Sequence, residues 1–199
     1  MLIIIAGMPA SGKTTVATRL SESLGFPILE KDAIKEALFD TIGFNNYAEK
    51  RQLDVAATAV LLSCCDSLLK TKKTLIVVNN FRADAVDSVK ELIQKHNTSC
   101  VTLFFKGDSD VFYKRYVDRD IRHERHLGHV LQHRFPPIEG DSHDYTMTRE
   151  EFAEKFEKLG MDKFDIGGTR IEIDATNPDK INVDDLIQQI KKCIKSIEA

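Results

Sequence analysis

The sequence predicts an α/β domain in which helices cover both faces of a parallel sheet. Two observations point to this class. Short apolar stretches alternate with longer stretches of helical periodicity, and a glycine-rich turn directly follows the first apolar stretch. The chain has 199 residues, of which 42% are hydrophobic and 30% are charged, which suits a domain with a substantial core. We therefore treat residues 1–199 as a single domain.

The glycine-rich turn has the sequence GMPASGKT over residues 7–14. It fits the phosphate-binding pattern GxxxxGK[ST], and it lies between a strand predicted over 2–6 and a helix predicted over 13–24. Its glycines let successive N–H groups turn inward around a phosphate, and the helix start adds the positive end of its dipole. The residues expected to bind the phosphates are Gly7, Pro9, Ala10, Ser11, Gly12, Lys13, Thr14 and Thr15.

A second short strand is predicted over 28–29, and Asp32 follows it just before a helix predicted over 33–39. Asp32 therefore lies at the carboxyl end of a parallel strand, where open α/β sheets place their ligands. Its carboxylate could accept a proton from an attacking hydroxyl group. Alternatively, Asp32 only caps the helix. The two roles are compatible.

A third strand, predicted over 75–78, ends in Asn79 and Asn80. Proteins with this type of phosphate loop usually carry an acidic residue there, which holds the Mg²⁺ shell. Two amides add no negative charge. Either Asp32 supplies that charge, or Thr14, phosphates and water hold the Mg²⁺. Arg82, at the start of the next helix, could contact a substrate anion or lie at the surface.

The remaining elements follow from apolar periodicity and helix-start signals. Asn46 with Glu49, Asp108, and Thr148 with Glu151 mark helix starts. We predict helices over 47–71, 83–95, 148–159 and 183–197, and strands over 101–105 and 170–174. The turn over 174–179 is either an adenine-contacting loop or an ordinary surface turn.

Residues 114–134, KRYVDRDIRHERHLGHVLQHR, are rich in basic side chains. Four arginines recur every three or four residues: Arg115, Arg119, Arg122 and Arg125. A helix would gather them on one side, where their guanidinium groups could close over a triphosphate as a lid. The alternative is a solvated helix with internal ion pairs. We predict a lid over about 114–135 and a substrate-side insertion over about 136–168.

These motifs resemble the P-loop kinases of the nucleoside-monophosphate-kinase-like class, within the AAA-type ATPase/kinase family. In particular, they resemble the branch of polynucleotide 5′-hydroxyl kinases, zeta toxins, chloramphenicol phosphotransferase and gluconate kinase-like enzymes. The resemblance rests on GMPASGKT, on KDAIKEAL with Asp32, on NNFR after the third strand, and on the arginine-rich stretch that ends in RHLGH. Together these motifs cover most of residues 1–130.

The resemblance implies a three-layer α/β/α fold with strand order 2-3-1-4-5, and ATP and Mg²⁺ as cofactors. It implies that Asp32 is the general base and that Lys35 faces the acceptor. Thr14 and Asp32 would hold the metal ion, and Arg115 and Arg119 would contact the nucleotide. The catalytic residues implied are Lys13, Asp32, Arg119, Arg122 and Arg125.

We expect a kinase that transfers the γ-phosphoryl group of ATP to a hydroxyl group of a small molecule. A polynucleotide 5′ end is also possible, with Tyr113, Tyr116 and Phe135 as stacking residues. The alternative is an ATP-binding switch or slow ATPase without an acceptor, which Asn79 and Asn80 favour. The net charge of −3 gives no general case for nucleic-acid or membrane binding. With no signal segment, no apolar run long enough for a bilayer and no CxxC pair, we expect a cytoplasmic protein.

Overall fold

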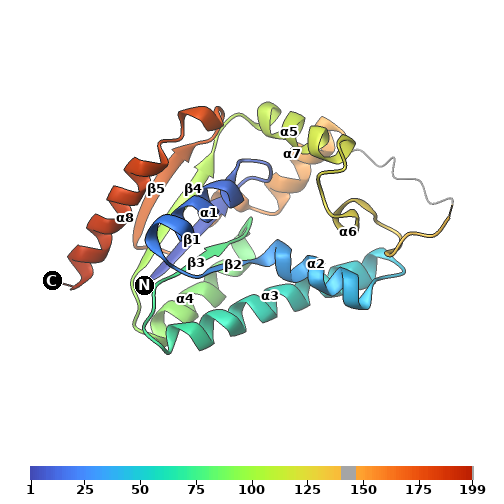
Figure 1. Ribbon diagram of the computed structural model, residues 1–199. Coiled ribbons are helices and arrows are strands. Elements are labelled where there is room, and N and C mark those ends of the chain that lie inside the picture. Colours follow the sequence, from blue (N-terminus) through green and yellow to red (C-terminus); the bar gives the residue numbers. More distant parts are fainter. Residues whose placement is uncertain (140–146, 199) are drawn as a thin grey trace.

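The computed structural model describes residues 1–139 and 147–198. Its centre is a parallel sheet of five strands in the order β2-β3-β1-β4-β5 (Figure 1). Both the predicted three-layer α/β/α class and the predicted strand order are confirmed. The strands are β1 (Leu2–Gly7), β2 (Ile28–Glu30), β3 (Leu75–Val78), β4 (Cys100–Lys106) and β5 (Thr169–Asp174).

Helices cover both faces of the sheet. The longer helices are α1 (Lys13–Leu24), α2 (Lys31–Ile42), α3 (Tyr47–Leu69), α4 (Val86–Lys95), α5 (Ser109–Ile121), α7 (Arg149–Lys158) and α8 (Val183–Glu198). The short α6 (Leu127–Val130) follows α5, and single 3₁₀ turns lie at Ala83–Ala85, Met161–Lys163 and Pro178–Lys180. The predicted caps by Asn46, Asp108 and Thr148 are all present.

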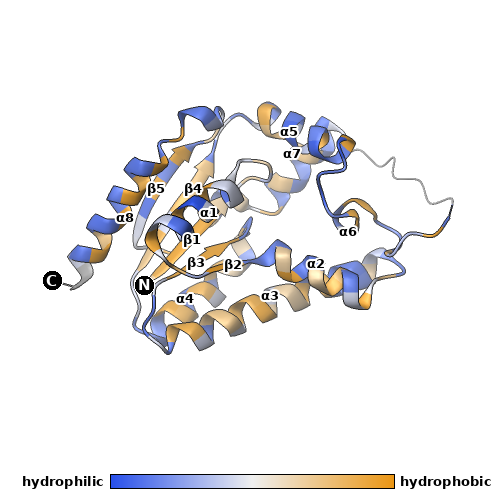
Figure 2. Cartoon of the chain, in the orientation of Figure 1, coloured by the Kyte–Doolittle hydropathy of each residue, from blue (hydrophilic) through white to orange (hydrophobic). Residues whose placement is uncertain are grey.

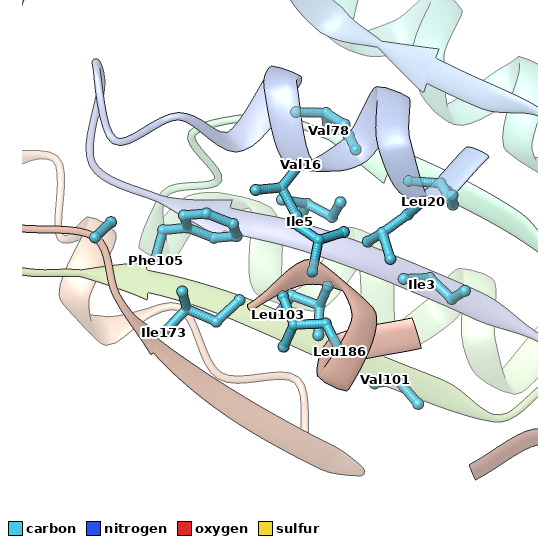
Figure 3. Packing of buried hydrophobic residues seen from close by; sticks show 14 of the residues in the cluster. Ile3, Ile5, Val16, Leu20, Val78, Val101, Leu103, Phe105, Ile173 and Leu186 are labelled. Atoms are coloured by element: carbon cyan, nitrogen blue, oxygen red, sulfur yellow. The ribbon is translucent and has the colours of Figure 1, made fainter. Parts of the chain in front are cut away.

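The sheet has a hydrophobic core on each face. Alternate side chains of β1 point to opposite faces and so belong to different cores. Ile3 and Ile5 pack with α1 and α8, as Figure 3 shows around Leu20 and Leu186. Leu2 and Ile4 join the second cluster, to which α3 and α4 contribute. A strand buried on both faces must be apolar at every position, which is why β1 reads as a continuous hydrophobic run (Figure 2).

Some predicted helices differ from the structure: the one predicted over 83–95 is a 3₁₀ turn followed by α4, and two further differences bear on the site. The helix after β2 begins at Lys31 with Glu30 as its N-cap, so Asp32 lies in the first turn and does not cap it. The basic stretch is not one helix, because α5 ends at Ile121 and His123 takes a left-handed backbone with φ of 53°. Arg125 therefore does not share a helical face with Arg115 and Arg119.

A third, separate cluster joins the end of the basic stretch to α2 and α3. It contains Phe39, Phe44, Leu53 and Leu131, with Leu38, Leu127 and Phe135 packed against it. A Cβ on Gly128 would lie 2.3 Å from Cδ2 of Phe39, so α6 reaches α2 only because this position is glycine. Of the predicted lid, residues 127–135 are thus anchored on α2 and α3.

The helix α3 is more apolar than we expected from the sequence. Its most apolar stretch has a mean hydropathy of 1.4, and it is long enough to cross a membrane by length and composition. The expectation that no apolar run has that length was wrong. Only one side of α3 is packed, with Leu53, Ala57 and Leu61 buried, and 28% of the apolar stretch is buried in total. A helix that packs one face against a protein core can satisfy the same criterion of length and composition.

We predict that Gly128→Ala destabilises the fold by about 1–3 kcal/mol, because the added methyl group overlaps the Phe39 ring. The free energy of unfolding from urea titration measures the change. The double variant Gly128→Ala with Phe39→Leu is the matched control, since the smaller side chain makes room for the methyl group. Equal stabilities of Gly128→Ala and the original chain would contradict the packing described.

Candidate active site

A large cleft, with a cavity volume of about 1880 Å³, opens at the carboxyl ends of β1, β2 and β3. The glycine-rich turn forms one end, and the start of α2, one side of α3, and parts of α5 and α7 form the walls. Asn79 and Asn80 also line it. The carboxyl edge of a parallel sheet is where α/β folds bind ligands.

The turn after β1 has the geometry of a phosphate cradle. Gly7 has a φ of 129°, and a Cβ there would lie 2.1 Å from the carbonyl oxygen of Phe105 on β4. Ala10 and Gly12 also take positive φ values of 58° and 86°. Gly12 is the N-cap of α1, so the first N–H groups of that helix open towards the loop. Only glycine fits at position 7.

Lys13 lies buried inside the loop. Its Nζ donates to the carbonyl oxygens of Gly7 (3.0 Å) and Met8 (2.6 Å), and lies 3.4 Å from Oγ of Ser11. Burial lowers the pKa of Lys13 to about 7, while the charge of Asp32 raises it and that of Arg119 lowers it. A bound phosphate would place negative charge next to Nζ of Lys13 and so favour its protonated form.

Two carboxylates, Glu30 and Asp32, lie at the end of β2 opposite the loop. The hydroxyl of Thr14 is 3.5 Å from Oε2 of Glu30, and both acids line the cleft. Burial raises the pKa of Glu30, and the charge of Asp32 raises it further, against the lowering effect of the Thr14 contact. Sequence reasoning missed Glu30, although its spacing from Asp32 in EKD was a usable signal.

The asparagines after β3 carry no charge, and the side chain of Asn79 is hydrogen-bonded within its own turn. The backbone N–H of Asn80 donates to Oδ1 of Asn79 at 2.8 Å, so the amide oxygen is used within the turn. Arg82, just beyond, makes two contacts with Asp84 at 3.2 and 3.1 Å. Negative charge near Thr14 therefore comes from the end of β2 and not from the end of β3.

The predicted lid arginines are in different environments. Arg119 lines the cleft, and its charge acts on Lys13. Arg115 donates to the carbonyl oxygens of Ala175 (2.9 Å) and Thr176 (2.6 Å), which fixes the turn after β5. Arg122 lies at the C-cap of α5.

Arg122 and Arg125 both form ion pairs with carboxylates of the protein. Arg122 is 64% exposed and lies 3.4 Å from Glu124. Arg125 is 15% exposed, with NH1 2.6 Å from Asp120, and its guanidinium group lies 4.4 Å from the centroid of the Tyr116 ring. Both arginines nevertheless line the cleft, as Arg115 and Arg119 do, and their catalytic role stays a prediction.

The aromatic residues considered for base stacking are used in packing. Tyr113 and Tyr116 meet the ring of Phe152 edge-on, at 5.7 and 5.4 Å between centroids. Phe135 belongs to the cluster around Phe39 and Phe44. The rings proposed to stack on a polynucleotide are therefore engaged with the protein itself.

We predict that binding of ADP takes up a proton between about pH 7.5 and 9.5. The pKa of Lys13 is about 7 in the empty loop, and a bound phosphate raises it, so affinity falls as pH rises, by up to about tenfold per pH unit. Calorimetry in buffers of different ionisation enthalpy measures the uptake. Lys13→Ala is the control, with no uptake in this window; a flat affinity profile for the original chain would contradict the burial argument.

Comparison with known proteins gives the site a family context. A family model described as "AAA domain" matches residues 2–136. A "Putative adenylate kinase" of Sulfurisphaera tokodaii is 38% identical over 76 residues, which are 38% of this chain and 39% of that relative's length.

Solved structures agree on the fold. A "putative kinase from chloroflexus aurantiacus j-10-fl" is 26% identical, covers 96% of each chain and has a TM-score of 0.79. A "Shikimate Kinase from Bacteroides thetaiotaomicron", 16% identical over 98% of each chain with a TM-score of 0.55, supports the fold alone. The narrower branch of polynucleotide kinases and zeta toxins is not singled out by these matches. Because the family model spans well over half of the sequence, the chain belongs to the AAA domain family, with a P-loop kinase fold.

Proposed function

We propose that this protein is a phosphotransferase that moves the γ-phosphoryl group of ATP to a hydroxyl group of a small molecule. The observation that carries this proposal is the placement of Lys13 and Thr14 opposite Glu30 and Asp32 in one cleft. The loop offers a phosphate cradle, and the end of β2 offers carboxylates that can receive a proton. The cleft also continues beyond the loop along α3 and α7, which leaves room for an acceptor.

The reaction needs few groups, because positioning and charge neutralisation dominate phosphoryl transfer. The acceptor oxygen forms a bond to the γ-phosphorus as the bond to the β–γ bridging oxygen breaks, and ADP leaves. The hydroxyl proton passes to the carboxylate of Asp32. Lys13 and Arg119 both line the cleft, and their charges interact, so both could neutralise the negative charge of the phosphates.

The residues near Thr14 fit a magnesium ion. Mg²⁺ prefers oxygen ligands and usually keeps several waters, and a hydroxyl group with neighbouring carboxylates is such a donor set. We infer that Thr14 would hold the ion and that Glu30, with Asp32, would supply the negative charge missing at Asn79. Bound there, Mg²⁺ would neutralise phosphate charge.

The cytoplasmic location expected from the sequence remains a prediction.

We predict that Asp32→Asn retains ADP affinity and lowers phosphoryl transfer roughly 10²–10⁴-fold, because the amide cannot accept the proton. The measurement uses γ-labelled ATP, Mg²⁺ and pooled sugars, nucleosides, antibiotics and 5′-hydroxyl oligonucleotides. Lys13→Ala controls for contaminating kinases and should transfer no label.

Two results would contradict these assignments. Undiminished transfer by Asp32→Asn would remove Asp32 from its role as the base. Tight ATP binding with no transfer to any pool, together with a change in shape or in affinity for a protein partner, would favour an ATP-binding switch instead.

We also predict that Glu30→Gln raises the Mg²⁺ concentration needed for half-maximal transfer, while metal-free ADP binding stays unchanged. The reason is that Glu30 is a carboxylate next to the Thr14 hydroxyl. A Mg²⁺ titration of transfer rate measures the change. Glu22→Gln, an exposed position on α1, is the matched control. An unaltered Mg²⁺ requirement in Glu30→Gln would place the metal shell elsewhere.

A further inference from the structure

The short helix α6 begins with a histidine at the position where a small polar residue is usual. His126 is the N-cap of α6, and its Nδ1 accepts a hydrogen bond from the backbone N–H of Gly128 at 3.0 Å. Asn, Ser and Thr are common N-caps, and their side-chain oxygens accept hydrogen bonds at any pH near neutrality. An imidazole nitrogen differs from them, because histidine takes up a proton between about pH 5 and 8.

The contacts of His126 fix which ring nitrogen carries the proton. Nδ1 accepts a hydrogen bond, so it is unprotonated, and the proton of the neutral ring lies on Nε2. Nε2 is 3.0 Å from Oδ1 of Asp40 on α2, which can accept that proton in a hydrogen bond. Both contacts therefore describe the same neutral tautomer. A second proton on the ring would lie on Nδ1, directly facing the N–H of Gly128.

The N–H of Gly128 lies where water cannot easily replace the lost acceptor. Gly128 is buried against the ring of Phe39, so closely that a Cβ would lie 2.3 Å from Cδ2 of that ring. A buried N–H without an acceptor is more unfavourable than an exposed ion pair is favourable. Asp40 is 63% exposed, so its attraction for a charged His126 does not offset the lost cap.

Other charged groups surround His126 and its neighbour His129. The centroids of the two rings are 6.3 Å apart, so two charged imidazoles repel one another. Within the described part of the chain, the groups that face the two rings are Asp40, Glu36 and Lys35 of α2, Lys50 of α3, and Arg125 with its partner Asp120. Three carboxylates meet three cations in this set, which leaves no excess of negative charge to hold a second proton on His126.

We propose that α6 is an acid-sensitive latch, in which protonation of His126 breaks the N-cap and releases α6 from α2. The anchored state needs Nδ1 unprotonated and so binds fewer protons than the released state, which means that anchoring weakens as pH falls. His126 and His129 both line the cleft, so release of α6, which lies beside α2 in Figure 1, alters the wall of the cleft. The latch does not depend on phosphoryl transfer.

The test follows the amide proton of Gly128 by NMR hydrogen exchange in the full chain. Between about pH 8 and about pH 5.5, its protection factor, corrected for the intrinsic effect of pH on exchange, should fall at least about tenfold. The ¹⁵N shifts of the His126 ring should show the Nε2–H tautomer at the upper pH. Equal protection at both pH values, or a proton on Nδ1 at the upper pH, would overturn the proposal.

The variant His126→Asn removes the titration but retains the cap, because asparagine is a good N-cap without a proton to gain. Its Gly128 amide should change in protection less than about twofold over the same pH range. His123→Asn is the matched control, since it makes the same substitution at an exposed position whose φ of 53° asparagine tolerates. This control should show the full loss. A loss in His126→Asn as large as in the original chain would show that His126 is not the switch.

The variant Asp40→Asn distinguishes a titrating cap from a purely structural one, and does so without altering His126. Charged His126 then lacks its ion-pair partner, so the midpoint of the loss of protection should move about 0.3–0.7 units to lower pH. A structural cap that does not titrate has no such midpoint to move. A midpoint that stays in place or moves to higher pH would contradict the assignment.

Discussion

The close approach of Gly7 to Phe105 is the constraint on which the rest of the site depends. The strand β1 is central, paired on one side with β3 and on the other with β4. At its end the chain must leave the sheet, curl around a phosphate and begin α1. It can do so only because no Cβ lies between Gly7 and the carbonyl oxygen of Phe105. This contact fixes where the loop sits relative to the carboxylates at the end of β2.

Charged groups of both signs line the cleft. Lys13, Lys31, Lys35, Arg119 and Lys155 are basic, and Glu30 and Asp32 are acidic. Partial burial strengthens each of these fields, because less water screens them.

The third hydrophobic cluster gives the walls of this cleft a common support. Phe39 of α2, Leu53 of α3 and Leu131 pack together, away from the two cores of the sheet. His126 and His129 add polar contacts across the same boundary, with Nε2 3.0 Å from Asp40 and from Glu36. The end of the basic stretch is therefore part of the wall formed by α2 and α3, while Arg119 on α5 faces the loop.

Local patterns were enough to predict the layers, the strand positions and the phosphate loop. Continuous apolar runs, capping residues such as Asn46, and the fixed spacing of Gly7, Gly12 and Lys13 depend on neighbours in sequence, so a single chain displays them. The prediction of one helix that carries all four arginines was wrong, although all four line the cleft. Their spacing described a helix, but the left-handed turn at His123 interrupts it, and Asp120 takes Arg125 into a buried pair.

The sequence by itself determined the parallel sheet, the phosphate-binding turn and the acid that follows β2, because backbone geometry and hydrophobic periodicity encode them locally. Only the tertiary structure decided that Glu30 faces Thr14 and that Asp54 lies between Lys31 and Lys35. These contacts join residues 16, 19 and 23 positions apart in the sequence. Their meeting depends on how helices pack on the sheet, and no short-range pattern carries that information.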